Sequence, residues 1–149
     1  MSAPAITATS FTPPPTLRGD GVEWIVEAFG CDAARLTSRD ALAALVGDVV
    51  ASLALRPVAP AVWHQFPPPG GITGMVLLAE SHLALHTFPE HGSLTLNLFC
   101  CAPRQEWDWE AGLARHVGAR EVRVRRVERV YAPTSTVSVG GPSSGEPAS

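Results

Sequence analysis

Residues 72–89 decide the fold of this chain, and they read Ile-Thr-Gly-Met-Val-Leu-Leu-Ala-Glu-Ser-His-Leu-Ala-Leu-His-Thr-Phe-Pro. The run 72–79 is almost entirely apolar, which indicates a strand that is covered on both faces or is central in its sheet. The run 82–86 also has the pattern of a strand. Glu80 and Ser81 stand between the two runs, where a polar group costs free energy unless it is paired or used. The stretch therefore predicts two strands that meet at a polar junction.

Outward from this stretch, strand and helix patterns alternate along the chain. Alternating apolar residues indicate strands, and capping residues ahead of apolar positions three or four apart indicate helices. The order β-α-β-β-β-β-α-β predicts an α+β fold, a two-layer α/β sandwich with a mostly antiparallel sheet and two helices on one face. The expected strands are 23–29, 59–65, 72–79, 82–86, 93–101 and 121–131; one helix is capped by Thr37 or Ser38 and ends near Leu55, and the other is capped by Asp108 and carries Trp109, Leu113 and Val117.

The composition restricts the partners and the compartment. A length of 149 residues fits one domain, and a net charge of −3 predicts neither nucleic acid nor an anionic membrane as partner. No apolar run approaches the length of a membrane span, and no signal-peptide pattern opens the chain, so a cytoplasmic protein is expected. Segments 1–20 and 133–149 are rich in proline, serine, threonine or glycine and are predicted to be disordered tails.

The reactive residue types restrict the chemistry further. The chain has three cysteines, Cys31, Cys100 and Cys101, and this odd number without an export signal predicts free thiols. The sequence contains no lysine. Enzymes that form a Schiff base through a lysine, including those that depend on pyridoxal phosphate, are therefore excluded.

Three interpretations of the polar junction follow from residue types alone. His82 and His86 are four apart, a spacing that suits metal binding on a helix, but the segment has the pattern of a strand. A Ser–His hydrolase would need a nucleophile elbow of the form Gly-x-Ser-x-Gly and a carboxylate to orient the histidine, and neither is evident. The third interpretation is that Ser81 and the histidines are core polar groups with hydrogen-bond partners. Because Ser81 and His86 are an odd number apart, their cooperation requires the backbone to turn at the Glu80–Ser81 bond.

A fourth interpretation comes from resemblance. Glu-Ser-His at 80–82, His-Thr-Phe-Pro-Glu at 86–90, and Cys101 twenty residues after the serine resemble the processing region of bacterial S-adenosylmethionine decarboxylase. The resemblance covers about 21–131 and also includes Val-Glu-Ala-Phe-Gly-Cys-Asp from position 26 and Phe-Pro-Pro-Pro-Gly from position 66. It implies a decarboxylase domain at 21–132 that is made as a proenzyme and cleaves itself between residues 80 and 81.

The resemblance assigns roles in processing and catalysis. Ser81 would attack the carbonyl of Glu80 to form an ester, and elimination and hydrolysis would leave a covalent pyruvoyl group at residue 81, a shift that backbone strain would favour. His86 would move a proton during elimination, and Thr73 would bind the reacting carbonyl. The pyruvoyl group would form a Schiff base with the substrate and act as electron sink, and Cys101 would reprotonate the substrate carbon.

The resemblance also implies the substrate, its contacts and the assembly. S-adenosylmethionine would give carbon dioxide and the aminopropyl donor of polyamine (spermidine) biosynthesis. Phe66 matches the aromatic residue that stacks on the adenine, and Phe88 is a substrate-binding position where the family usually has Trp. Glu90 matches the carboxylate that holds the ribose hydroxyls, and Glu27 matches an acidic substrate-site position in the first strand. The cleaved chains would form a heterodimer, and two heterodimers would pair. No metal is implied.

The sequence departs from the family pattern around the substrate contacts. Phe88 replaces the usual Trp, Asn97 replaces Asp, Ala102 replaces Gly, and one extra residue separates Phe66 from Thr73. Two alternatives follow. One is pyruvoyl-dependent decarboxylation of another amino acid, such as ornithine or arginine. The other is a non-catalytic regulatory homologue, against which the intact serine, histidine and cysteine argue.

Overall fold

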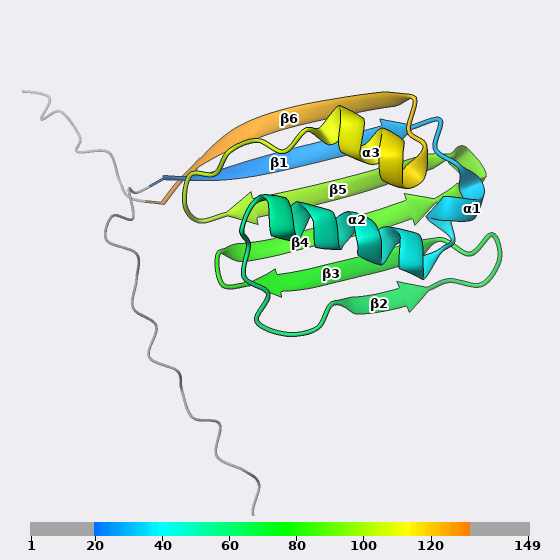
Figure 1. Ribbon diagram of the computed structural model, residues 1–149, viewed down its shortest axis with the longest axis horizontal. Helices are drawn as coiled ribbons and strands as arrows, with labels where there is room; N and C mark the ends of the chain where they lie inside the picture. Colours follow the sequence, from blue (N-terminus) through cyan, green and yellow to red (C-terminus); the bar gives the residue numbers. More distant parts are fainter. Residues whose placement is uncertain (1–19, 132–149) are drawn as a thin grey trace, which may run out of the picture.

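The computed structural model describes residues 20–131 as a single sheet with helices packed against it (Figure 1). The predicted tails 1–20 and 133–149 lie outside the described residues, except that Asp20 begins the first strand. The elements are β1 (Asp20–Phe29), α1 (Ala33–Leu36), α2 (Arg39–Ser52), β2 (Val62–Gln65), β3 (Ile72–Leu78), β4 (Ser81–Phe88), the 3₁₀ helix η1 (Pro89–His91), β5 (Ser93–Cys100), α3 (Trp109–Val117) and β6 (Glu121–Val130).

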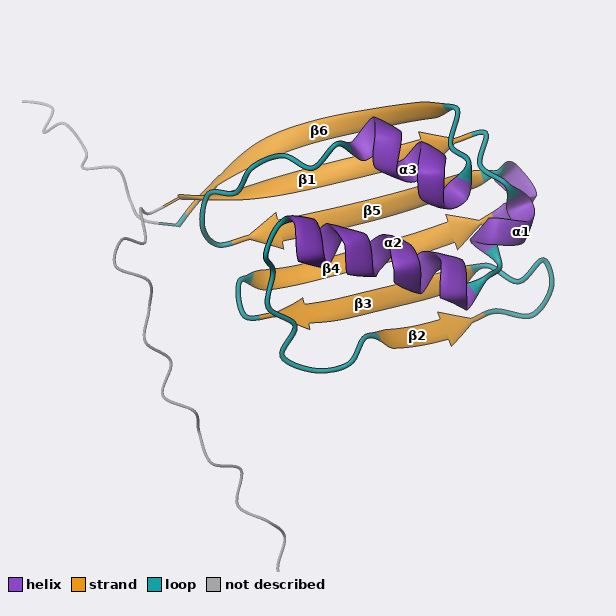
Figure 2. Ribbon diagram, viewed as in Figure 1, coloured by secondary structure: helices purple, strands orange, loops and turns teal. Residues whose placement is uncertain are grey.

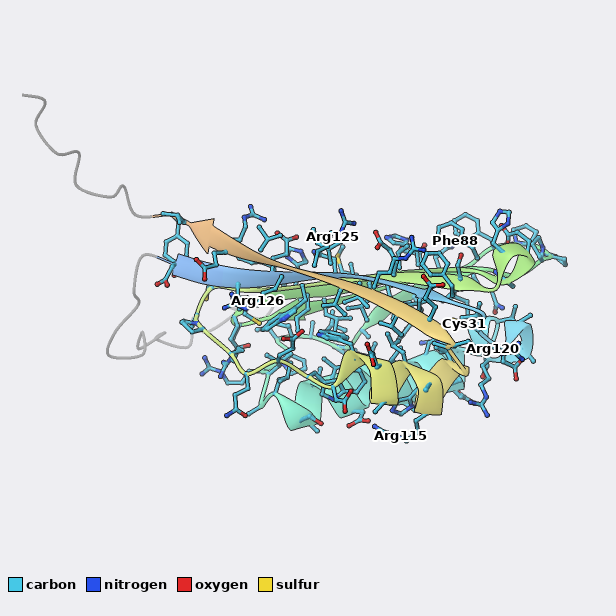
Figure 3. All side chains as sticks on the ribbon, turned by 90° about the horizontal axis from the view of Figure 1, so that it is seen from above. Cys31, Phe88, Arg115, Arg120, Arg125 and Arg126 are labelled. Carbon is cyan, nitrogen blue, oxygen red and sulfur yellow. The ribbon has the colours of Figure 1, made fainter. Side chains whose placement is uncertain are left out.

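The sheet has six strands in the order β2-β3-β4-β5-β1-β6, and every neighbouring pair is antiparallel. Helices α2 and α3 lie on one face of it, and no helix within residues 20–131 covers the other face (Figures 2 and 3). The predicted α+β sandwich and its element order are confirmed. We call the side of the sheet away from the helices the open face.

The core lies between the sheet and the two longer helices. Side chains alternate between the core and the open face along each strand, as the period of two requires. On β4, for example, Leu83 and Leu85 are fully buried while His86 and Phe88 are exposed. The remaining core is apolar and includes Val22, Trp24, Val26, Leu42, Leu45, Val49, Leu94, Leu96, Leu98 and Leu113.

Capping explains where the helices begin. Ser38 and Asp108 cap α2 and α3 by accepting hydrogen bonds from main-chain N–H groups three residues on, as predicted. Asp32 caps the short helix α1, which the sequence analysis missed because four residues carry too little periodicity to be recognised.

Several element boundaries differ from the prediction; β1 begins at Asp20 rather than at residue 23, and β4 runs to Phe88 rather than to residue 86. Helix α2 ends at Ser52 rather than near Leu55, because Ala54 takes a positive φ of 49°. Strand β2 begins at Val62 rather than at residue 59, since Pro60 has no N–H to donate to the neighbouring strand. No helix within residues 20–131 is long and apolar enough to cross a membrane.

Candidate active site

The junction between the two runs is a tight turn between β3 and β4. Ala79 and Glu80 form the turn, and Ser81 is the first residue of β4, opposite Leu78 of β3 and Cys100 of β5. Ser81 is half-buried and has a φ of 155°, a positive value that non-glycine residues rarely adopt. The backbone therefore turns at the Glu80–Ser81 bond.

The Glu80 side chain is held on all sides. It is 3% exposed, and its carboxylate accepts hydrogen bonds from Arg56 Nε at 2.7 Å, from Arg104 Nη2 at 3.3 Å and from the Arg56 main-chain N–H at 3.1 Å. Burial by itself raises the pKa of this carboxyl, but the hydrogen bonds from Arg56 outweigh burial and lower the pKa below its ordinary value. Glu80 is thus a buried, ionised side chain directly before Ser81.

The main chain of Glu80 is held as well. Its carbonyl oxygen accepts a hydrogen bond of 2.8 Å from the main-chain N–H of Cys101. Cys101 follows the end of β5 and is half-buried, and the Tyr131 hydroxyl donates to its carbonyl oxygen. Cys100, in contrast, is buried in the core, and burial raises the pKa of its thiol to about 11. Only the second of the two adjacent cysteines therefore lies beside the turn as an accessible thiol.

A second group of predicted site residues lies at the other end of β4. Thr73 of β3 and His86 of β4 are cross-strand partners, and their side chains form a hydrogen bond of 3.0 Å between Oγ1 and Nδ1. Both line a hollow of about 320 Å³, which also has Phe66, Pro67, Pro69, Gly71, Thr87, Phe88 and Glu90 in its walls. The hollow gathers predicted substrate residues from the β2–β3 loop, β4 and η1.

Thr87 supports this hollow from below, and the sequence analysis missed it. Its side chain is 5% exposed. Its hydroxyl donates to the carbonyl of Leu36 at 2.8 Å and accepts from the N–H of Ile72, also at 2.8 Å. Thr87 thereby joins the end of α1 to β3 and β4. The alternation of β4 could have identified it, because it places this polar residue on the core face.

The open face carries a polar row between the two groups. His82 Nε2 lies 3.0 Å from Asn97 Oδ1, and the Asn97 amide donates to Glu23, which also pairs with Arg129. Glu27 lies on the same face of β1, in the wall of a second hollow of about 310 Å³ together with His86 and Asn97. Arg125 of β6 donates to Glu27, and Figure 3 shows Arg125 and Phe88 on this face, with Arg115 on the helix side.

One chain does not bring all the predicted catalytic residues together. Ser81 and His86 are five residues apart on one strand, a separation of about 16 Å at the rise of a β-strand. The structure places Glu80, Ser81 and Cys101 at one end of β4, and Thr73, His86 and the substrate residues at the other. Within residues 20–131, no group of three or more His, Cys, Asp and Glu side chains could hold a metal ion.

The sequence is similar to known decarboxylases. Residues 22–130 match the S-adenosylmethionine decarboxylase family. The S-adenosylmethionine decarboxylase proenzyme of Acetivibrio thermocellus is 36% identical over 107 residues, which cover 66% of this chain and 83% of that protein. The proenzyme of Shouchella clausii is 32% identical over 113 residues, 73% of this chain and 84% of that protein. The crystal structure of the adenosylmethionine decarboxylase from Aquifex aeolicus has a TM-score of 0.62 at 25% identity and covers 76% of this chain and 92% of that chain.

The fold and the site define an α+β protein with a polar site on the open face of an antiparallel sheet. The chain belongs to the S-adenosylmethionine decarboxylase family. The resemblance stated from the sequence is confirmed, and so is the predicted enzyme class: an adenosylmethionine decarboxylase proenzyme, a carboxy-lyase of polyamine biosynthesis. The family is pyruvoyl-dependent.

Proposed function

We propose that this proenzyme cleaves itself between Glu80 and Ser81 and forms its pyruvoyl group from Ser81. The observation that carries the proposal is the geometry of this bond. It lies in a tight turn, its carbonyl is held by the Cys101 N–H at 2.8 Å, and its serine has a φ of 155°. A held carbonyl beside a strained serine is the arrangement that an acyl shift requires.

The Ser81 hydroxyl attacks the Glu80 carbonyl carbon, so that an ester bond replaces the amide bond. The Cys101 N–H donates to the carbonyl oxygen, where negative charge develops during the attack. Elimination breaks the bond between Oγ and Cβ of residue 81 and releases the Glu80 carboxylate. Water then converts the remaining dehydroalanine to a pyruvoyl group and ammonia. The products are chains 1–80 and 81–149.

The residues fit a pyruvoyl group at position 81. When present, this group supplies an electrophilic carbonyl for the substrate amine and an electron sink for decarboxylation. Cys101 is half-buried and lies beside the turn, and its thiol would return a proton to the substrate carbon. His86 forms a hydrogen bond with Thr73 and lies about 16 Å along β4 from Ser81 of its own chain, so it would move a proton during processing at Ser81 of a second copy.

The hollow at the other end of β4 supports S-adenosylmethionine as the substrate. Phe66 and Phe88 are both half-exposed and offer aromatic faces for the adenine. Glu90 offers two carboxylate oxygens to the ribose hydroxyls, and Glu27, which is paired with Arg125, lies on the same face of the sheet. The positive charge of the sulfonium favours a site with aromatic rings and carboxylates.

The distance of about 16 Å between the two ends of β4 supports a dimer of cleaved pairs. The open face has no covering helix among the described residues, so a second copy can stack on it. If the two sheets run in opposite directions, His86 and Thr73 of the second copy come close to Ser81 of the first. Each active site then contains residues from two copies.

The test is the intact mass of the purified protein under denaturing conditions. We expect two chains, one ending at Glu80 and one beginning at residue 81 that is lighter by the loss of ammonia and blocked to N-terminal sequencing. Ser81→Ala should remain a single chain of 149 residues, while the matched control Ser52→Ala on helix α2 should cleave normally. Cleavage of Ser81→Ala at the same bond would refute the serine mechanism. The substrate has a separate test, in which carboxyl-labelled S-adenosylmethionine should release labelled carbon dioxide.

A further inference from the structure

The carboxylate of Glu80 has no chemical step in the proposed cleavage, yet it is the most completely paired acidic group at the turn. A buried charge costs free energy unless other charges and hydrogen bonds compensate it. Two arginines and one main-chain N–H provide that compensation, while the side chain stays 3% exposed. Such an arrangement holds a side chain in one place.

Arg56, which precedes β2 in the chain, binds the turn through its side chain and its main chain. Its Nε and its main-chain N–H donate to different oxygens of Glu80, and its carbonyl accepts from the N–H of Ala79 at 2.8 Å. Two residues further on, the N–H of Val58 donates to the carbonyl of Leu77 at 3.0 Å. The segment that begins at Arg56 is thereby hydrogen-bonded to the end of β3 and to both residues of the turn, Ala79 and Glu80.

Arg104 donates to the same carboxylate from the C-terminal half of the chain. It belongs to the loop after β5, three residues beyond Cys101, whose N–H binds the Glu80 carbonyl. The loop after β5 therefore holds Glu80 at two points, the carbonyl oxygen through Cys101 and the side chain through Arg104. With its acyl end fixed at both points, the scissile bond has little freedom to rotate its carbonyl away from the Cys101 N–H.

We propose that Arg56 and Arg104 are positioning residues for self-cleavage, which act by clamping the Glu80 side chain so that its carbonyl stays between the Cys101 N–H and the Ser81 hydroxyl. The inference rests on the proposed cleavage and explains why a glutamate stands before the serine. After cleavage, Arg104 and Glu80 belong to different chains, so their ion pair ties the new end of the N-terminal chain to the C-terminal chain. Arg56 and Glu80 stay within one chain.

The experiment follows cleavage over time by intact mass after cell-free synthesis of the full chain. Displacing a reacting group by about 1 Å costs up to about 100-fold in rate, so we expect Arg56→Gln, Arg104→Gln and Glu80→Gln each to cleave at least about tenfold more slowly than the parent. Arg123→Gln is the matched control, because Arg123 is 64% exposed and paired with Glu121, as Arg56 is 62% exposed and paired with Glu80. The control should cleave at the parent rate.

A double variant separates positioning from general damage to the fold. If Arg56 acts through Glu80, Arg56→Gln combined with Glu80→Gln cleaves no more slowly than Glu80→Gln alone. Rates that multiply would overturn the inference, as would Arg56→Gln and Arg104→Gln variants that both cleave within twofold of the parent. Thermal unfolding of each variant in a Ser81→Ala background shows whether it folds. If Arg56→Gln does not fold, Arg104→Gln, with its side chain 28% exposed, decides the matter.

The outcomes also separate this inference from the function on which it rests. A parent chain that never cleaves refutes self-cleavage, and the positioning role with it. A parent that cleaves alongside arginine variants of unchanged rate refutes the positioning role alone. Arg56→Lys gives a further check, because a lysine restores the charge near Glu80. We expect it to cleave faster than Arg56→Gln and more slowly than the parent, whereas a rate equal to that of Arg56→Gln would contradict a role for the charge.

Discussion

Thr87 offers a direct test of how the substrate hollow is supported. Thr87→Val keeps the shape of the side chain and replaces its hydroxyl with a methyl group. That hydroxyl joins the carbonyl of Leu36 to the N–H of Ile72, each at 2.8 Å. Leu36 is fully buried and Ile72 is 1% exposed, so water cannot replace the lost bonds without local opening.

The magnitude follows from the two groups that lose their partner. A buried polar group left without a hydrogen bond costs about 1–3 kcal/mol. The Ile72 N–H is a single donor that loses its acceptor. The Leu36 carbonyl oxygen has two lone pairs and tolerates the loss of one donor better. We therefore expect Thr87→Val to lower the free energy of unfolding by about 2–5 kcal/mol, a large share of the about 5–15 kcal/mol typical of a domain.

The assay is urea unfolding followed by tryptophan fluorescence, with both proteins in the Ser81→Ala background so that each is one chain. Trp24 and Trp109 are buried in the core and report its loss. The control is Thr95→Val, since Thr95 is half-buried on the open face of β5 and should change stability by less than about 0.5 kcal/mol. A Thr87→Val protein within about 1 kcal/mol of its parent would show that the hydroxyl does not carry the packing of α1 against the sheet.

Two further predictions concern groups with shifted pKa values. Hydrogen bonds, chiefly from His116, lower the pKa of Asp48 from 3.8 to about 2, so the stabilisation is complete above about pH 3.8 and is lost as the pH falls through about 2. Urea unfolding should show Asp48→Asn destabilised by about 0.5–1 kcal/mol at neutral pH, with the difference shrinking between pH 4 and 2; a constant difference would contradict the ion pair. Because burial raises the pKa of Cys100 to about 11, iodoacetamide at pH 8 should label Cys101 first, and mass spectrometry showing Cys100 labelled first would refute this.

Most of the fold was predictable because strand and helix periods are local properties. The alternation along 93–101 and the caps at Ser38 and Asp108 are short-range patterns, and the structure confirms them. The short helix α1 was missed because its stability comes from packing, with Leu36 fully buried, rather than from propensity. Tertiary contacts of this kind leave no period in the sequence.

Candidate site residues could be named from the sequence, but their arrangement in space could not. Phe66, Thr73 and His86 line one hollow, because the antiparallel pairing of β2, β3 and β4 brings them together. The clamp on Glu80 could not be foreseen. Arg56 lies 24 residues before Glu80 and Arg104 lies 24 residues after it, and neither has a pattern that marks it as a partner of a buried carboxylate.

Because of the arrangement along β4, the proposed cleavage depends on the proposed pairing of two copies. Ser81 and His86 lie on one hydrogen-bonded strand, paired with β3 on one side and β5 on the other, so their separation of about 16 Å cannot shrink without breaking both ladders. Side chains of serine and histidine are too short to close that gap. If His86 transfers a proton during the chemistry of Ser81, it must therefore do so across an interface. The open face of the sheet, with its polar row between the two ends, is the surface on which two copies would meet.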